Sequence, residues 1–183
     1  MDAKPAAPNP YLKTHIAIPQ DHGSWVFLLS PLLIGMFAGK NLSLATPFLL
    51  LAAFAAFLLR QSVSTLIKTL TGRRSRRDLP PAALWTFIYS LLGLIGLVGL
   101  GWQGLGWVAL LAIPALPVFA WHLWLVSRRA ERRQIGVEIL GAGTLALAST
   151  AAVWVGLGRV DPIGWWLWGL TWLQSAASIV YAY

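Results

Sequence analysis

Pro19-Gln20-Asp21-His22-Gly23-Ser24-Trp25, followed by the apolar run from Val26 to Gly39, indicates how this chain folds. A proline disfavours helix in the residue before it, so Pro19 separates the preceding segment from the apolar run. Asp21 or Ser24 can accept hydrogen bonds from the free N–H groups of a first helical turn. A tryptophan ahead of a long apolar run is typical of the membrane interface. The stretch therefore predicts a helix that enters a membrane at its N-terminal end.

The whole chain has the composition of a membrane protein. Of its 183 residues, 57% are hydrophobic and 11% are charged, whereas soluble domains carry about 25% charged residues. The chain has no cysteine, which excludes disulfides, thiol catalysis and cysteine-ligated metals. Its net charge of +8 would suit nucleic acid, but the charges lie between apolar runs, where they orient a membrane protein. We therefore expect membrane lipid, and not nucleic acid, among its partners.

The apolar segments predict an all-α fold, a polytopic transmembrane helix bundle with six spans. A span needs roughly 20 apolar residues, and we place the six at about 23–39, 43–60, 81–101, 105–126, 135–157 and 163–183. Residues 1–18 are predicted to be a proline-rich tail, without the apolar core of a cleavable signal peptide. Residues 19–183 are predicted to be the transmembrane domain, with a basic loop at 61–80.

The distribution of Lys and Arg predicts the orientation. The tail, the end of the second segment with its following loop, and the loop after the fourth segment carry every Lys and Arg except Lys40 and Arg159. Because loops rich in Lys and Arg stay in the cytoplasm, we expect both termini there. We place the protein in the inner membrane of a bacterium.

The loop at 61–80 contains two further features. Residues 64–70 are expected to form a short interfacial helix that Gly72 ends. Arg73, Arg74, Arg76 and Arg77 then form a basic cluster at the level of the lipid head groups. Contact with anionic lipid is one interpretation of this cluster, and a phosphate-bearing ligand is the other.

Five residues are expected near the cytoplasmic face at a similar depth: Asp21, His22, Arg60, Gln61 and Glu138. A neighbouring carboxylate favours the protonated form of a histidine, and an arginine at the end of an apolar helix can bind a phosphate or carboxylate with two hydrogen bonds. These residues predict either a ligand site or a group of ion pairs that only hold helices together.

Glu138 lies three residues inside the fifth segment, and intramembrane acids are costly unless they have a partner. The residues that share its helical face are small, apart from one leucine: Gly141, Leu145, Ala148, Ser149 and Ala152. That face is expected to pack inward and to take Glu138 with it. The alternative is that Glu138 pairs at the surface with Arg132 or Arg133.

Tryptophan and glycine follow patterns that are typical of membrane helices. We expect Trp102, Trp107, Trp165, Trp166 and Trp168 at the outer interface, and Trp25, Trp85, Trp121 and Trp124 at the inner one. Gly35 with Gly39, and Gly93 with Gly96 and Gly99, are expected to let helices approach closely.

The cofactor is not determined by the sequence. His22 and His122 fall near the same end of their segments, so either could ligate a tetrapyrrole, and the two together a haem. His122 is better explained as an interfacial residue between Trp121 and Trp124, and His22 as a neighbour of the helix cap. We expect no metal site, because a closed zinc site needs four ligands and only Asp21 and His22 are adjacent.

The opening stretch resembles the YwiC-like family of bacterial integral membrane proteins, through Pro19, Asp21, His22, Gly23, Ser24 and Trp25. The resemblance continues through residues 59–61 and, more weakly, residues 178–181. The family has no assigned activity, so the resemblance implies architecture. The layout is also similar to the UbiA-type prenyltransferase superfamily, but the acidic motif of those enzymes has no counterpart, because no Asp follows Arg60 and Gln61 before Asp78.

These features lead to three functional hypotheses. The first is a non-enzymatic subunit or scaffold of a larger membrane complex, for example an energy-transducing or photosynthetic one, which would bring other membrane subunits as partners. The second is an isoprenoid- or lipid-handling enzyme of UbiA-like layout. The third is a small-solute transporter, based on Glu138 and the proline-containing fourth segment.

Overall fold

The structure is a computed structural model that describes residues 14–19, 22–128 and 134–182. Within these ranges the chain forms helices and connecting turns, without strands. The helices are α1 (Thr14–Ala17), α2 (His22–Gly39), α3 (Thr46–Leu70), α4 (Leu79–Trp102), α5 (Ala112–Ser127), α6 (Ile135–Leu157) and α7 (Pro162–Ala182). Short 3₁₀ helices, η1 (Arg76–Asp78) and η2 (Gly106–Leu111), precede α4 and α5.

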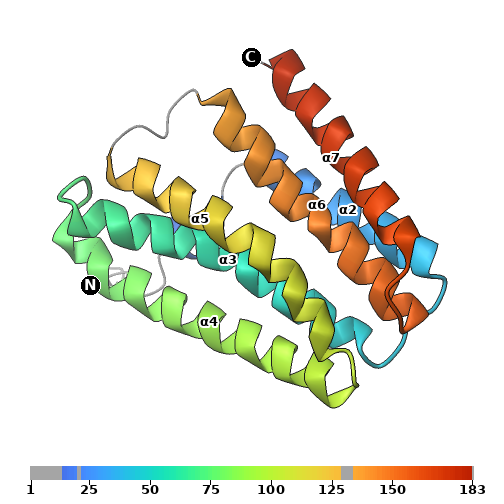
Figure 1. Cartoon of the computed structure of the whole chain (residues 1–183). Coiled ribbons are helices and arrows are strands. Elements are labelled where there is room, and N and C mark those ends of the chain that lie inside the picture. The colour runs from blue at the N-terminus through green and yellow to red at the C-terminus, as the bar shows by residue number, and fades with distance from the viewer. Residues whose placement is uncertain (1–13, 20–21, 129–133, 183) are drawn as a thin grey trace, which may run out of the picture.

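The six long helices form a bundle in which α6 is central (Figure 1). On one side α3 packs against α4 and α5, and on the other α6 packs against α2 and α7. Helix α6 also contacts α3 and α5, so it joins the two groups. In its most apolar 18-residue window 61% of α6 is buried, against 28% or less for α3, α4 and α5.

Small residues let α2 and α6 pack closely. A Cβ atom added to Gly35 would lie 2.8 Å from the Ala152 Cβ, and one added to Gly156 would lie 2.8 Å from the Gly39 Cα. Only glycine fits at such separations, so the predicted packing role of Gly35 and Gly39 is confirmed. Ser149 also lies against Gly35 and is buried, so this part of the predicted small face of α6 does point inward.

The glycines of α4 have the same role against α3. A Cβ atom on Gly96 would lie 2.9 Å from the Ala52 Cβ, and one on Gly99 would enter the ring of Phe48. A Cβ on Gly93 would lie at an ordinary 3.6 Å from Ala55. The close approach is therefore concentrated in the second half of α4, at the end of the bundle where α3 begins.

The buried core lies toward that same end. Its largest cluster includes Leu32, Leu49, Leu100, Leu111 and Val153. These residues come from the second half of α2, α4 and α6, the start of α3 and η2. We call this the outer end of the bundle. The opposite end, where α2 and α6 begin and α3, α5 and α7 finish, is the inner end.

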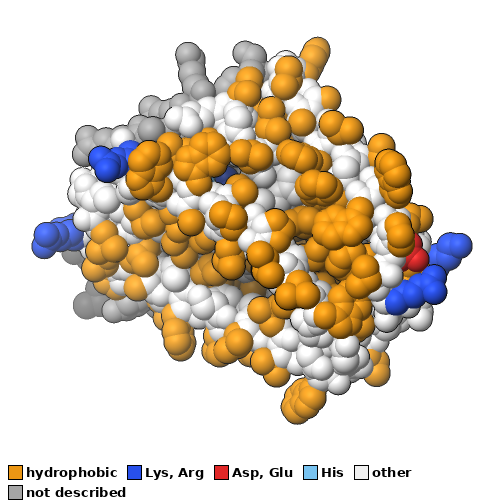
Figure 2. Space-filling view, in the orientation of Figure 1, with side chains coloured by type: hydrophobic (Ala, Val, Ile, Leu, Met, Phe, Trp, Pro, Cys, Tyr) orange, Lys and Arg blue, Asp and Glu red, His pale blue; other side chains and the backbone are white. Residues whose placement is uncertain are grey.

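The surface of the bundle is that of a membrane protein. Within the described ranges, four stretches are long and apolar enough to cross a membrane: Thr46–Leu70, Arg76–Trp102, Gly106–Ser127 and Ile135–Leu157. Gly23–Gly39 is a shorter apolar helix. Large apolar side chains are exposed, such as Phe37 at 83% and Trp102 at 88%. Figure 2 shows hydrophobic side chains spread across one face, with Lys and Arg at its edges.

The predicted loop at 61–80 is mostly helical, so its boundary is corrected. Helix α3 continues ten residues beyond Arg60, and the predicted interfacial helix at 64–70 is its final part. In this continuation Ser62 donates to the Leu58 carbonyl and Thr69 to the Thr65 carbonyl. Their polar atoms are thereby satisfied within the helix. Gly72, with φ at 72°, follows the end of the helix as predicted.

The end of the predicted tail is also structured. Ile16 and Ala17 in α1 are buried against α3 and α4, and the Tyr89 hydroxyl donates a 2.8 Å hydrogen bond to the Ala17 carbonyl. Residues 14–17 are therefore part of the bundle, while residues 1–13 lie outside the described ranges. Of the two predicted caps, Ser24 lies inside α2 as its third residue, and Asp21 is outside the described ranges.

Candidate ligand cleft at the inner end

A cleft with a volume of about 420 Å³ opens among five helices near the inner end. It is lined by Gly23, Ser24, Phe27, Arg60, Val118, Phe119, His122, Val137, Glu138, Gly141, Ala142, Thr144, Leu145 and Ile179. These residues come from the start of α2, the middle of α3, the second half of α5, the start of α6 and the end of α7. We refer to it as the inner-end cleft.

The contact between α2 and α6 is close at the outer end and leaves open space at two glycines of the inner end. At the outer end their backbones meet at Gly39 and Gly156. At the inner end both Gly23 and Gly141 line the cleft, and a Cβ atom on either would meet nothing within 4 Å. Gly141 was predicted to lie on a packing face of α6, and this prediction is wrong. The small-residue face of α6 packs in its outer part and borders open space in its inner part.

Three ionisable side chains line the cleft, each from a different helix. Arg60 comes from α3, His122 from α5 and Glu138 from the first turn of α6. Arg60 does not end its helix as predicted, since it lies ten residues before Leu70, or about 15 Å along the axis at 1.5 Å per residue. The charge of Arg60 therefore lies well inside α3, a helix that is long enough to cross a membrane.

Glu138 was predicted either to pack inward with its helical face or to pair with an arginine at the surface. It is exposed rather than packed inward with Ser149, and its face of α6 borders the cleft. Arg132 and Arg133, its predicted surface partners, lie outside the described residues. The acid is thus placed where a molecule in the cleft would meet it.

The predicted five-residue cluster is brought together in part. Arg60 and Glu138 both line the cleft, whereas Gln61 is half-buried and is not among the lining residues. Asp21 and the side chain of His22 lie outside the described part of the chain. The sequence analysis placed His122 at the same end but did not group it with Arg60. His122 follows Val118 by four residues and Phe119 by three, so the three share one face of α5. This spacing could have predicted that they line the same site.

Trp25 connects the opening stretch to the cleft wall. Its ring lies edge-on to Phe57 with centroids 4.9 Å apart, and it also contacts Phe54. Its indole N–H donates to the Pro19 carbonyl at 3.3 Å. Trp25 was predicted to be an interfacial anchor, but it packs against α3 one turn before Arg60. It therefore holds the start of α2 beside the arginine.

Comparison with protein families identifies this architecture. The family model described as YwiC-like protein matches residues 18–155. The chain belongs to the YwiC-like family. Comparisons with curated proteins and with solved structures gave no match.

The match to the YwiC-like family includes the opening stretch, α2 to α5, most of α6, and every cleft residue except Ile179. It ends before residues 178–181, so it does not include the weaker part of the predicted resemblance.

In this YwiC-like protein, Arg73 differs from the other arginines of the basic cluster. Its guanidinium is half-buried and donates a 2.6 Å hydrogen bond to the Val126 carbonyl in the last turn of α5. A cation that bonds the last carbonyls of a helix stabilises its negative end. Arg74, Arg76 and Arg77 are exposed. The Arg73 contact places them near Arg128, whose guanidinium lies 5.8 Å from the centre of the Trp124 ring.

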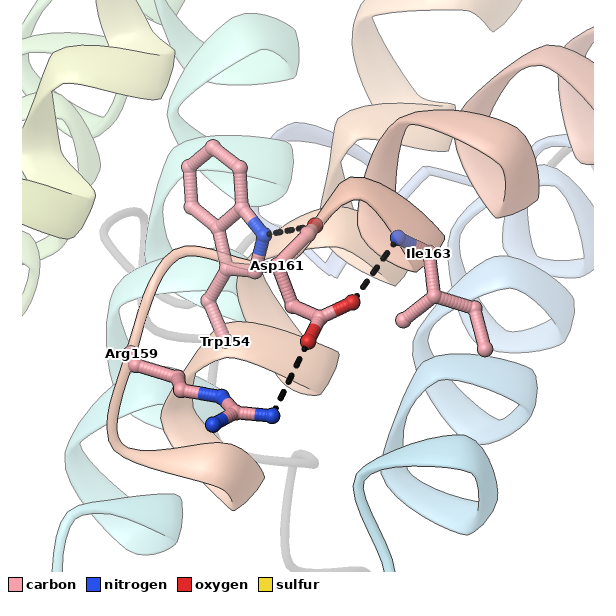
Figure 3. Close-up of polar contacts among 4 residues, drawn as sticks. All are labelled: Trp154, Arg159, Asp161 and Ile163. Carbon is pink, nitrogen blue, oxygen red and sulfur yellow. Dashed lines mark hydrogen bonds and ion pairs between the residues drawn. The ribbon is translucent and has the colours of Figure 1, made fainter.

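The charged residues of the outer end cap a helix (Figure 3). The Asp161 carboxylate accepts a 3.0 Å bond from the Ile163 N–H in the first turn of α7, and a 3.3 Å bond from Arg159. The buried Trp154 indole donates to the Asp161 carbonyl at 2.8 Å. The bond from the Ile163 N–H is that of a helix cap, and Arg159 forms an ion pair with the same carboxylate, so Asp161 has a structural role.

Five tryptophans of the predicted belts are exposed, and their place at the membrane interfaces stays a prediction. Trp102 and Trp166 are strongly exposed, and Trp121, Trp124 and Trp165 are about half exposed.

Other tryptophans connect helices. Trp107 in η2 packs against Trp154 in α6, whereas Trp85 stacks on Tyr89 within α4. Trp168 donates to the Gly143 carbonyl at 2.9 Å, and Trp172 donates to the Ile139 carbonyl at 2.8 Å. These bonds attach α7 to the part of α6 that lines the cleft.

The described residues contain no group of three His, Cys, Asp or Glu side chains that could hold a metal ion. His122 reaches the cleft, and the predicted pairing of its imidazole with His22 concerns a side chain that lies outside the described part of the chain. Among the described residues, the cleft offers one arginine, one histidine and one acid, with a hydroxyl group from Ser24, beside apolar walls.

Proposed function

We propose that this YwiC-like protein binds an amphiphile, with an anionic head group and an apolar chain, in the inner-end cleft. This proposal keeps the lipid- or isoprenoid-handling hypothesis but claims binding rather than catalysis. The observation that carries it is the placement of Arg60 and His122 beside apolar walls in one cleft. Ionisable groups at membrane depth are costly and often mark a site for substrate or ions.

The composition of the cleft supports such a ligand. Phe27, Val118, Phe119, Leu145 and Ile179 supply apolar contact from four helices. Arg60 supplies a planar set of donors that can bind a phosphate or carboxylate with two hydrogen bonds. Ligand sites commonly have volumes of about 300–1,000 Å³, with mostly apolar linings and a few polar groups. The volume of about 420 Å³ falls in this range.

We further propose that six helices span the inner membrane of a bacterium, with both termini and the cleft mouth on the cytoplasmic side. The described Lys and Arg residues support this orientation. Lys68, Arg74, Arg76, Arg77 and Arg128 belong to the inner end, whereas Lys40 and Arg159 belong to the outer end. Cations concentrate on the cytoplasmic side of membrane proteins.

The exposed arginines of the inner end are proposed to contact anionic lipid head groups. This proposal retains Arg74, Arg76 and Arg77 and adds Arg128, while Arg73 is assigned to the α5 terminus. Each cation near an anionic surface contributes about 1 kcal/mol. Adding phosphatidylglycerol to phosphatidylcholine nanodiscs should raise the melting temperature of the wild type more than that of a variant with all four changed to Gln. Equal increases would contradict the proposal.

The test of the cleft uses dodecyl phosphate as the probe, added to the purified protein in phosphatidylcholine nanodiscs. Isothermal titration should detect binding to the wild type and at least a tenfold weaker affinity for Arg60→Gln. Arg159→Gln is the matched control, because it removes the same charge at the outer end. Inorganic phosphate and dodecanol, titrated separately, distinguish head-group binding from chain binding.

Two results would overturn the ligand proposal. One is a wild type that does not bind dodecyl phosphate. The other is an Arg60→Gln variant that binds it as well as Arg159→Gln does. Preference for dodecanol over dodecyl phosphate would also contradict the role of the arginine, since the chain alone would then account for binding.

A scaffold within a larger membrane complex is the second candidate. Helices α4 and α5 are only 22% and 17% buried in their most apolar windows, which leaves apolar surface for a partner subunit. Purification in mild detergent tests this, since a stable second protein should copurify in fixed ratio. Recovery of the chain alone would count against a scaffold and would leave lipid as the covering of α4 and α5.

A further inference from the structure

Three glycines on α6 meet three different surroundings. A Cβ atom on Gly143 would lie 2.8 Å from the Trp172 ring, so this glycine makes room for a tryptophan. A Cβ atom on Gly136 or on Gly141 would meet nothing within 4 Å. Gly136 is exposed outside the cleft, whereas Gly141 lines it. One helix therefore provides a packing glycine, a surface glycine and a cleft glycine.

Gly141 has no packing reason to be glycine. Glycine weakens a helix relative to alanine, because it loses more backbone freedom on folding. Close approach of a neighbouring helix usually compensates for this in membranes. Helix α6 has such an approach at Gly156 but not at Gly141. On the opposite wall of the cleft, Gly23 is equally open. The absence of side chains at these two positions keeps the cleft open.

The position of Gly141 along α6 also has a chemical meaning. Glu138 lies three residues before it and Leu145 four residues after it, so all three share one face of the helix. The Thr144 hydroxyl, also in the cleft, donates a 2.7 Å bond to the Gly141 carbonyl and thereby turns toward its own helix. Gly141 is thus the open point between a charged part and an apolar part of the wall.

We infer that Gly141, with Gly23 facing it, sets the size limit of the cleft at the junction between the head group and the chain of the bound amphiphile. This inference rests on the proposed function and names the residues that select the ligand by shape. A larger side chain at residue 141 would occupy the passage between Glu138 and Leu145. The helix would be preserved, since a Cβ atom at residue 141 meets no neighbour within 4 Å.

The experiment compares Gly141→Leu with Gly136→Leu, a matched control on the same helix with the same change in volume. Dodecyl phosphate affinity and melting temperature are measured for both in phosphatidylcholine nanodiscs. Gly141→Leu should weaken binding at least tenfold and keep its melting temperature within a few degrees of wild type. Gly136→Leu should leave both quantities unchanged. Gly141→Ala should weaken binding less than Gly141→Leu, and its melting temperature should not fall.

Three outcomes would overturn the inference. If the wild type and Gly141→Leu bind dodecyl phosphate equally, the size limit lies elsewhere and the proposed function still stands. If Gly141→Ala lowers the melting temperature as much as Gly143→Ala does, Gly141 is a packing residue. If the wild type does not bind dodecyl phosphate, the proposed function and this inference fail together.

Discussion

Replacing Gly35 with alanine tests whether direct backbone contact between α2 and α6 holds the bundle together. The added Cβ would overlap the Ser149 carbonyl oxygen and lie 2.8 Å from both the Ser149 Cα and the Ala152 Cβ. None of these atoms is the end of a flexible side chain, so the helices must move apart. Separation by 0.5–1 Å forfeits about a quarter to a half of each contact's dispersion energy.

The expected cost results from two opposing effects. Overpacking of a well-packed contact costs about 1–3 kcal/mol, and alanine recovers up to about 1 kcal/mol of helix propensity relative to glycine. Because several backbone atoms are involved, we expect Gly35→Ala to reduce the free energy of unfolding by about 1–2 kcal/mol. Gly136→Ala has the same propensity gain without any neighbour within 4 Å, so it should be neutral or stabilising.

The assay is reversible unfolding in maltoside micelles with increasing sodium dodecyl sulfate, followed by far-UV circular dichroism. The unfolding midpoint of Gly35→Ala should fall below that of the wild type, and Gly136→Ala should match or exceed the wild type. If Gly35→Ala is as stable as Gly136→Ala, the close contact between α2 and α6 does not stabilise the protein, and the packing argument is refuted.

Three further predictions concern orientation and polar contacts. The chain has no native cysteine, so an impermeant maleimide on intact cells should label a cysteine at Lys40 and not one at Ser75; the reverse pattern would contradict the topology. Arg73→Gln should lower stability by about 1.5 kcal/mol, because it loses a charged hydrogen bond, while Arg74→Gln should not. Equal melting temperatures for these two variants would argue against the assigned role. Tyr89→Phe should lower stability by about 1–3 kcal/mol, because it removes the donor to a buried carbonyl. The expected observation is faster proteolysis of the N-terminal segment than in the wild type.

The sequence indicated the class of fold and the packing of the outer end. Apolar runs predicted a helical membrane-type bundle because a bilayer requires long apolar helices. Gly35, Gly39, Gly96 and Gly99 were recognised as packing residues from their spacing alone. The opening stretch also indicated the YwiC-like family, since its unusual residue types lie within a few positions of one another. These are local properties, and they can be deduced without knowing which helices are neighbours.

The inner end depended on tertiary structure. Periodicity placed Gly141 and Ser149 on one face of α6, but only the positions of the neighbouring helices decide that Gly141 lines a cleft and Ser149 is buried. Likewise, Arg60 ended the apolar run, yet its helix continues for ten more residues, in which the Ser62 and Thr69 hydroxyls bond to the helix backbone. His122 joins Arg60 and Glu138 only because α5, α3 and α6 meet there. Spacing determines which side of a helix a residue occupies, whereas the presence of a neighbour on that side depends on how all the helices cross.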